Sequence, residues 1–217
     1  MNYGLMFKEL MIGLDWSLVI FFLTLVFALP LGLLVALARM SKIDTLRWIA
    51  RIYISVLRGT PLMLQLLVIY FGPYYIFRIQ LSYHYRLIAV VLAFSINYSA
   101  YFAEIYRAGI EAIPIGQYEA SYVLGLTRWQ NFSRILMPQV IKRILPPVTN
   151  EVITLVKDTS LAFSISMAEM FTRARELASG AANMLPFIFA GIIYYILNFI
   201  VALGMEHFEK RLSYYSE

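Results

Sequence analysis

The sequence predicts an all-α integral membrane protein with five transmembrane helices. Its 217 residues are 61% hydrophobic and 14% charged, whereas ordinary soluble domains carry about 25% charged residues. The hydrophobic residues also gather in long runs, each about long enough for a helix to cross roughly 30 Å of hydrocarbon. We therefore expect a single transmembrane domain over residues 1–217, with no separate soluble domain.

Five hydrophobic runs define the expected spans. The first and the last contain no charged residue, and no small-residue cleavage motif follows the first, which therefore predicts an uncleaved span rather than a signal peptide. The spans are expected at about 16–38, 52–77, 87–113, 144–170 and 184–205.

The second run is interrupted by Arg58-Gly59-Thr60-Pro61. Because Pro61 has no backbone N–H, it should free a carbonyl near Leu57 and allow the helix to bend or to line a cavity. One interpretation is that this stretch forms part of a gate or of the path that the substrate takes. A simple proline kink, with Arg58 reaching back to the cytoplasmic surface, is an equal alternative.

Lys and Arg are unevenly distributed between the loops. If the loop at about 114–138 is cytoplasmic, five of them lie outside: Lys8, Arg78, Arg86, Arg173 and Arg175. Eleven then lie inside: Arg39, Lys42, Arg47, Arg51, Arg107, Arg128, Arg134, Lys142, Arg143, Lys210 and Arg211. The positive-inside rule therefore predicts an outside N-terminus and a cytoplasmic C-terminus.

Several function classes are disfavoured by what the sequence lacks. There is no cysteine, and no glycine is followed by lysine, so the chain has no Walker-type phosphate loop. Its two histidines lie far apart, and no nucleophile stands at a recognisable motif spacing. The basic residues form no stripe with aromatic residues, which disfavours nucleic-acid binding. We expect neither an enzyme nor a cofactor or metal site in this chain.

The loop between the third and fourth runs predicts two short helices. The first covers about 117–124, closed by Gly125 in the left-handed conformation. Thr127 and Gln130 form a capping-box pattern that begins the second, and Pro138 is expected to end it. The first helix carries Glu119 among small and apolar neighbours, so it could insert into a groove of a partner. An ordinary amphipathic surface loop is the alternative.

This loop resembles the EAA signature of ABC-importer permeases. The matching residues at that spacing are Glu119, Ala120, Gly125, Ile135 and Pro138, and the departures are Ser121 and Met137. The resemblance implies a type I ABC importer permease fold, in which a cytoplasmic coupling helix between helices 3 and 4 fits a cleft of an ATP-binding subunit. The implied docking residues are Gln117, Glu119, Ala120, Ser121, Leu124 and Gly125.

A second set of polar residues is predicted near the middle of the membrane. Glu151 and Asp158 lie about 10 and 21 Å along the fourth span and share one helix face, because they are seven residues apart. Ionisable residues inside spans are candidates for function. The candidate substrate-binding residues are Asn97, Glu151, Asp158, Thr159, Ser160 and Thr60. Alternatively, Lys157 neutralises a carboxylate and the group only ties helices together.

Further stretches resemble the polar amino-acid branch of these permeases, which takes up histidine, glutamine, glutamate or basic amino acids. They include Arg58-Gly59-Thr60-Pro61, 103–109, Leu145-Pro146-Pro147 and 157–161. The resemblance implies a prokaryotic cell (inner) membrane location and pairing with itself or a close relative, with a homodimer expected. It also implies two ATP-binding subunits, which hold ATP and Mg²⁺, and an extracytoplasmic solute-binding protein.

The carboxylates favour a basic amino acid as the substrate, because Lys157 can offset only one of Glu151 and Asp158. A glutamine or glutamate permease is the first alternative. A membrane assembly protein that transports nothing, and a passive channel, are the alternatives from other classes. Uptake that needs ATP would distinguish an importer from both.

Overall fold

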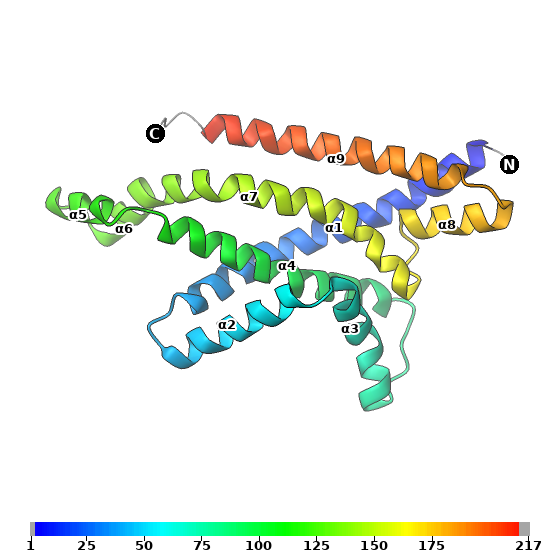
Figure 1. Cartoon of the computed structure of the whole chain (residues 1–217), viewed down its shortest axis with the longest axis horizontal. Helices are drawn as coiled ribbons and strands as arrows, with labels where there is room; N and C mark the ends of the chain where they lie inside the picture. Colours follow the sequence, from blue (N-terminus) through cyan, green and yellow to red (C-terminus); the bar gives the residue numbers. More distant parts are fainter. Residues whose placement is uncertain (1–2, 213–217) are drawn as a thin grey trace.

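The computed structural model describes residues 3–212 and shows an elongated bundle of helices (Figure 1). α9 runs along one edge of the bundle, and α5 and α6 stand at one tip. The elements are α1 (Tyr3–Arg39), α2 (Asp44–Gly59), α3 (Leu62–Phe77), α4 (Tyr85–Glu111), α5 (Ile115–Val123), α6 (Arg128–Gln130), the π-helix η1 (Asn131–Leu136), α7 (Met137–Asp158), the 3₁₀-helix η2 (Thr159–Ile165), α8 (Met170–Ala181) and α9 (Leu185–Leu212).

The centre of the bundle is the pair formed by α1 and α4, the most extensive helix contact of the described chain. Two glycines allow close approach here. A Cβ on Gly32 of α1 would lie 2.8 Å from Cβ of Phe102 on α4, and a Cβ on Gly109 of α4 would overlap Cγ2 of Ile144 on α7. Side chains larger than hydrogen at these positions would force α4 away from its neighbours.

The second predicted span is two helices rather than one. α2 begins at Asp44, before the predicted start, and α3 leaves it at an angle of 106° after Pro61. The bend is stabilised by two amide side chains. Nε2 of Gln65 donates to the Leu57 carbonyl at 2.9 Å, and Nδ2 of Asn97 donates to the same oxygen at 3.0 Å. The Leu57 carbonyl is therefore free of a helical partner, as expected, and Gln65 from α3 and Asn97 from α4 satisfy it.

The fourth predicted span, 144–170, also differs from a single helix. α7 ends at Asp158, and the chain continues through η2 and a short turn before α8 begins at Met170. Within residues 3–212, α1, α4 and α9 are long and apolar enough to cross a membrane, and the bent pair α2 and α3 makes a fourth candidate. α7 does not qualify by composition, so the count of five spans remains a prediction.

The loop at 114–138 contains the two expected short helices. Gly125 has a φ of +69°, in the left-handed region. The capping box is present, because Oγ1 of Thr127 accepts from N–H of Gln130 at 3.2 Å and Oε1 of Gln130 accepts from N–H of Thr127 at 2.9 Å.

The prediction that Pro138 ends the second helix is wrong. The helical path continues from α6 through η1 into α7, where Pro138 occupies the first turn and needs no N–H donor. The wider turns of η1, in which N–H of Met137 donates to the Phe132 carbonyl, carry the helix up to this proline. Pro146 and Pro147 also lie inside α7.

Candidate functional site

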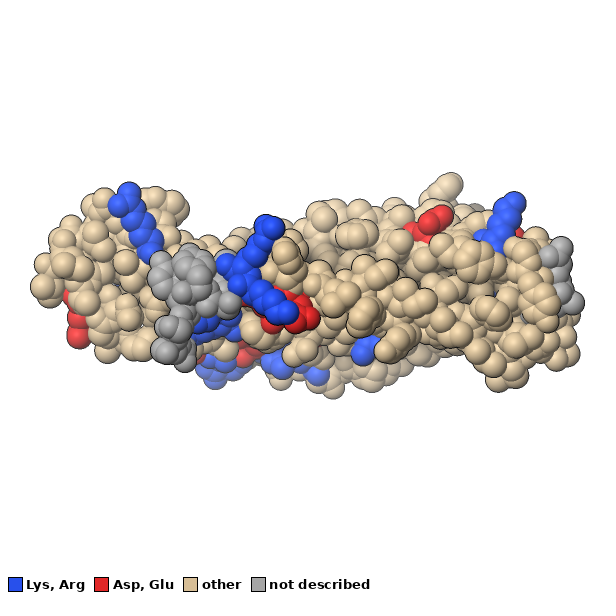
Figure 2. Space-filling view, turned by 90° about the horizontal axis from the view of Figure 1, so that it is seen from above, with Lys and Arg blue, Asp and Glu red and all other residues tan. Residues whose placement is uncertain are grey.

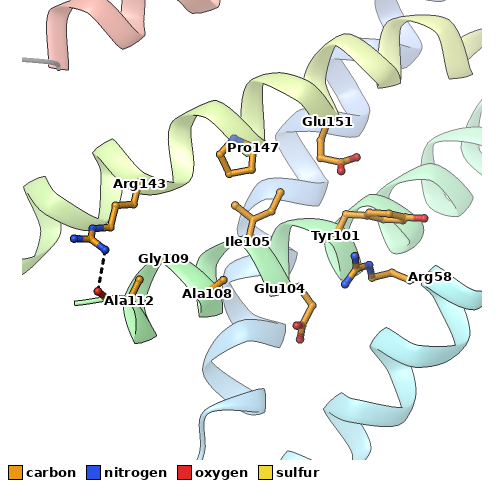
Figure 3. Close-up of a pocket in the computed structure, with 10 residues that line it drawn as sticks. All are labelled: Arg58, Tyr101, Glu104, Ile105, Ala108, Gly109, Ala112, Arg143, Pro147 and Glu151. Atoms are coloured by element: carbon orange, nitrogen blue, oxygen red, sulfur yellow. Dashed lines mark hydrogen bonds between the residues drawn. The ribbon is translucent and has the colours of Figure 1, made fainter. Parts of the chain in front are cut away.

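A groove of about 480 Å³ opens between α2, α4 and α7 (Figure 3). α4 forms its floor, with small side chains and Gly109 that leave room above the helix. Polar groups come from all three helices, and α2, which packs against α4, contributes Arg58. It is lined by Arg58, Tyr101, Glu104, Ile105, Ala108, Gly109, Ala112, Arg143, Pro147 and Glu151.

Two opposite charges face this groove without pairing. Cζ of Arg58 lies 5.0 Å from the centre of the Tyr101 ring, a cation–π distance. Within residues 3–212, neither Arg58 nor Glu151 has a hydrogen bond or an ion pair through its side chain. The two are close enough to interact electrostatically but lie farther apart than an ion pair.

Glu104, the other carboxylate of the groove, is already compensated. Nη2 of Arg107 lies 2.7 Å from one of its oxygens, and Nε of Arg39 lies 3.9 Å from the other. Arg107 also contacts Glu111 at 2.5 Å. Glu104 therefore belongs to a network of α4 and α1, which leaves Glu151 as the carboxylate of the groove that has no ion pair among residues 3–212.

Asp158 lies two turns beyond Glu151 on α7, as the seven-residue spacing predicts, but it does not line the groove. Its Oδ2 accepts a hydrogen bond from the Tyr98 hydroxyl at 2.7 Å, and Tyr98 is 2% exposed. This bond connects α4 to the end of α7. This partner is neutral, and the cation that interacts electrostatically with Asp158 is Lys157, the preceding residue.

The other candidate substrate residues make local hydrogen bonds. Asn97 is 4% exposed, with Nδ2 bonded to Leu57 and Gln65. Thr159 is 1% exposed and donates to the Val156 carbonyl, while Ser160 donates to the Lys157 carbonyl. Thr60 donates to the Val56 carbonyl beside the bend. A role for these four in binding substrate stays a prediction, and in this conformation Asn97 and Thr159 are shielded from a ligand.

Sequence reasoning left Arg58, Tyr101 and Glu104 out of the substrate site. A signal for them exists: Arg58 is a charge inside an apolar run, and Tyr101 and Glu104 lie three residues apart on one face of α4. Their grouping with Glu151 depends on the packing of α2 against α4, which no local pattern encodes. Among the described residues, no cluster of three His, Asp or Glu side chains is arranged to hold a metal ion.

The candidate docking helix α5 lies at the surface. Gln117, Glu119, Ala120, Leu124 and Gly125 are exposed, whereas Ser121 is 3% exposed and donates from Oγ to the Tyr118 carbonyl. Large apolar side chains surround the exposed set. Val123 is 88% exposed and Trp129 is 72% exposed. An apolar surface with one carboxylate is suited to a protein partner, and the docking roles remain predictions.

These features first define the class of protein: a polar groove between apolar helices, with an exposed helix at one tip of the molecule, is typical of the membrane subunit of a transporter. Comparison with known families then gives the assignment. Residues 28–214 match the family described as the inner membrane component of binding-protein-dependent transport systems, and the chain belongs to this family.

Characterised relatives agree on amino-acid transport. The chain is 39% identical to the L-cystine transport system permease protein TcyB of Bacillus subtilis, over 94% of this chain and 86% of that protein. It is 38% identical to the arginine transport system permease protein ArtQ of Bacillus subtilis, over 93% and 91% of the two chains. A solved structure, described as an amino acid ABC transporter with histidines, is 36% identical with a TM-score of 0.85, covering 94% of each chain.

The protein is therefore the permease subunit of a polar amino-acid ABC importer and a multi-pass inner membrane protein. It is not itself the ATPase of that system. The family works with a binding protein and with ATP-binding subunits.

Proposed function

We propose that this permease imports a basic amino acid, with arginine, lysine or histidine as the class of substrate. One observation carries the proposal: Glu151 and Asp158 share a face of α7, and within residues 3–212 neither has an ion pair. A carboxylate without an ion pair in a low-dielectric region is costly, so a ligand that brings an extra positive charge gains more there than a neutral one.

A neutral polar substrate, such as glutamine or cystine, is the second candidate. Arg58 favours it, because this cation in the same groove offsets part of the negative charge of Glu151. Relatives that transport cystine and arginine are nearly equally similar to this chain, at 39% and 38% identity. Overall identity therefore gives no preference between the two candidates.

The proposal includes the assembly and its orientation. Lys157 and Asn150 are exposed on α7, and polar side chains at this depth favour a second copy over lipid as their neighbour. Lys and Arg gather mainly over the half of the molecule that holds α5 and the end of α9 (Figure 2), which supports a cytoplasmic α5. In this arrangement two ATP-binding subunits dock on the α5 helices and hold ATP and Mg²⁺.

The test is uptake of labelled amino acids by the complete importer in proteoliposomes. We expect the wild type to take up arginine in preference to glutamine, and to do so only when ATP is enclosed in the proteoliposomes. The apparent affinity for arginine should fall about tenfold or more in Glu151→Gln and in Asp158→Asn, because each variant loses a charge-assisted contact. Glu176→Gln, which removes an exposed carboxylate of α8, is the control. Preference of the wild type for glutamine, or arginine affinity unchanged in both variants, would refute the basic substrate. Uptake without ATP would indicate a channel.

A further inference from the structure

Arg58 and Glu151 present an unusual arrangement for two opposite charges. They line one groove, they are the two charged groups there that have no hydrogen-bonding partner among residues 3–212, and yet they do not pair with each other. Opposite charges in a partly apolar surrounding attract strongly, yet each of these two keeps hydrogen-bonding groups that no residue of the described chain uses.

The neighbours of each residue explain why they stay apart. The Arg58 guanidinium lies over the face of Tyr101, which holds a cation without using its N–H donors. Glu104 also interacts electrostatically with Arg58, but Arg107 and Arg39 make the closer contacts with that carboxylate. Figure 3 shows Arg58 beneath Tyr101 and Glu151 on the opposite side of that ring. The five donors of Arg58 and both oxygens of Glu151 are thus available to a ligand.

The ligand that satisfies both groups at once must carry an anion and a cation close together. The main chain of every free amino acid does so, with a carboxylate and an ammonium group on the same carbon. A guanidinium binds a carboxylate through two parallel hydrogen bonds, and a carboxylate accepts from an ammonium. The two protein groups come from different helices, α2 and α7, which line one groove together with α4.

We propose that Arg58 binds the α-carboxylate of the transported amino acid and Glu151 binds its α-ammonium. The groove between α2, α4 and α7 then recognises the part that all amino acids share. The proposal rests on amino-acid transport and not on the charge of the side chain. It also divides the work of the two carboxylates of α7: Glu151 serves the main chain, and Asp158 is left to distinguish side chains.

The experiment uses matched pairs of ligands that differ in one main-chain group. Arginine is compared with agmatine, which lacks the carboxylate, and with 5-guanidinopentanoate, which lacks the ammonium. Cystine is compared with cystamine in the same way. Equilibrium binding is measured on the complete importer in lipid nanodiscs. In the wild type we expect each truncated analogue to bind about tenfold or more weakly than its parent.

The variants then assign each group. Arg58→Gln should weaken arginine about tenfold or more and leave agmatine within about twofold, while Arg58→Lys should recover part of the loss because it restores a cation. Glu151→Gln should weaken arginine but not 5-guanidinopentanoate. Arg51→Gln is the matched control: Arg51 lies seven residues earlier on the same face of α2, outside the groove, and should change nothing.

The proposal is overturned if the wild type binds agmatine as tightly as arginine, a result that depends on no variant. It is also overturned if Arg58→Gln weakens arginine and agmatine equally, because a merely structural effect would do so. Its failure is distinct from failure of the basic substrate. If cystine or glutamine proves to be preferred, the same loss in Arg58→Gln should appear with that ligand and its decarboxylated analogue.

Discussion

Two breaks between helices are built in opposite ways. Between α2 and α3, the chain turns by 106° at Pro61, and the exposed Leu57 carbonyl is satisfied by Asn97, 40 positions away in the sequence. Between α5 and α6, the turn is stabilised by residues next to it: Gly125 takes a positive φ, and Thr127 caps the following helix. The first break is fixed by the interior of the bundle and the second by its own sequence.

The two breaks also have different places in the molecule: the α2–α3 bend lies next to the groove, whereas the α5–α6 turn lies at the exposed surface. A bend held by long-range hydrogen bonds cannot change without disturbing α4. A turn held by local caps keeps its shape even where neighbouring helices move. Three changes test this contrast, from the largest expected effect to the smallest.

The largest effect is expected at the surface turn. Gly125→Asp places a Cβ where φ is +69°, at a cost of about 1 kcal/mol or more, and Glu119→Lys reverses the exposed charge of α5. We expect each variant to reduce ATP-driven uptake below about a tenth of wild type, because a tenfold loss needs only about 1.4 kcal/mol of lost binding. Each variant should also reduce co-purification of the ATP-binding subunit. Uptake and pull-down are the measurements.

The control for the surface turn is Gly180→Asp on α8, where the backbone is ordinary and the space around a Cβ is open. It should keep normal uptake. If both α5 variants assembled and transported as the wild type does, the docking role of this turn would be wrong.

An intermediate effect is expected at the interior bend. Asn97→Ala removes the donor to the Leu57 carbonyl and to Gln65, so we expect the free energy of unfolding to fall by about 1–3 kcal/mol. Thermal unfolding in detergent measures it. Gln80→Ala, at an exposed glutamine in the loop after α3 with no side-chain hydrogen bond in the described chain, should change the free energy by less than about 0.5 kcal/mol. Equal melting of both variants would contradict a bend fixed from the interior.

The smallest effect is expected from Thr127→Ala. Loss of the cap costs about 1 kcal/mol at the start of α6, but the effect should remain local because the capping box lies at the surface. Amide hydrogen exchange at 128–130 should quicken while the global melting temperature stays near that of wild type, and Thr127→Ser should restore protection. A large fall in melting temperature would show that the turn is not independent of the bundle.

The same contrast explains what could be predicted from the sequence. The capping box and the left-handed Gly125 were predictable, because a few neighbouring residues determine them. The free carbonyl near Leu57 was predictable from Pro61, but its partners were not, because Asn97 reaches it through tertiary packing. Pro138 was misjudged since the π-turns of η1 bring the helix to this proline without a break, and single-residue rules do not include such turns.

For the candidate site, each charged residue was visible but the grouping was not. Glu151 and Arg58 both lie in runs predicted to be apolar, so each is conspicuous alone. The packing of α2, α4 and α7 places Arg58 and Glu151 in one groove. In the same groove, Glu104 forms an ion pair with Arg107. The apolar periodicity of each helix gives the face it buries, not the neighbour that covers it.

The unbroken helical path from Arg128 to Asp158 has a mechanical consequence. At about 1.5 Å per residue, it joins the surface turn to Glu151 over roughly 35 Å. Pro146 and Pro147 interrupt the backbone hydrogen bonding about one turn before Glu151. A helix that lacks two successive donors is more compliant at that level than elsewhere. Force applied at α5 therefore arrives beside the groove as a change of angle more readily than as a displacement along the helix axis.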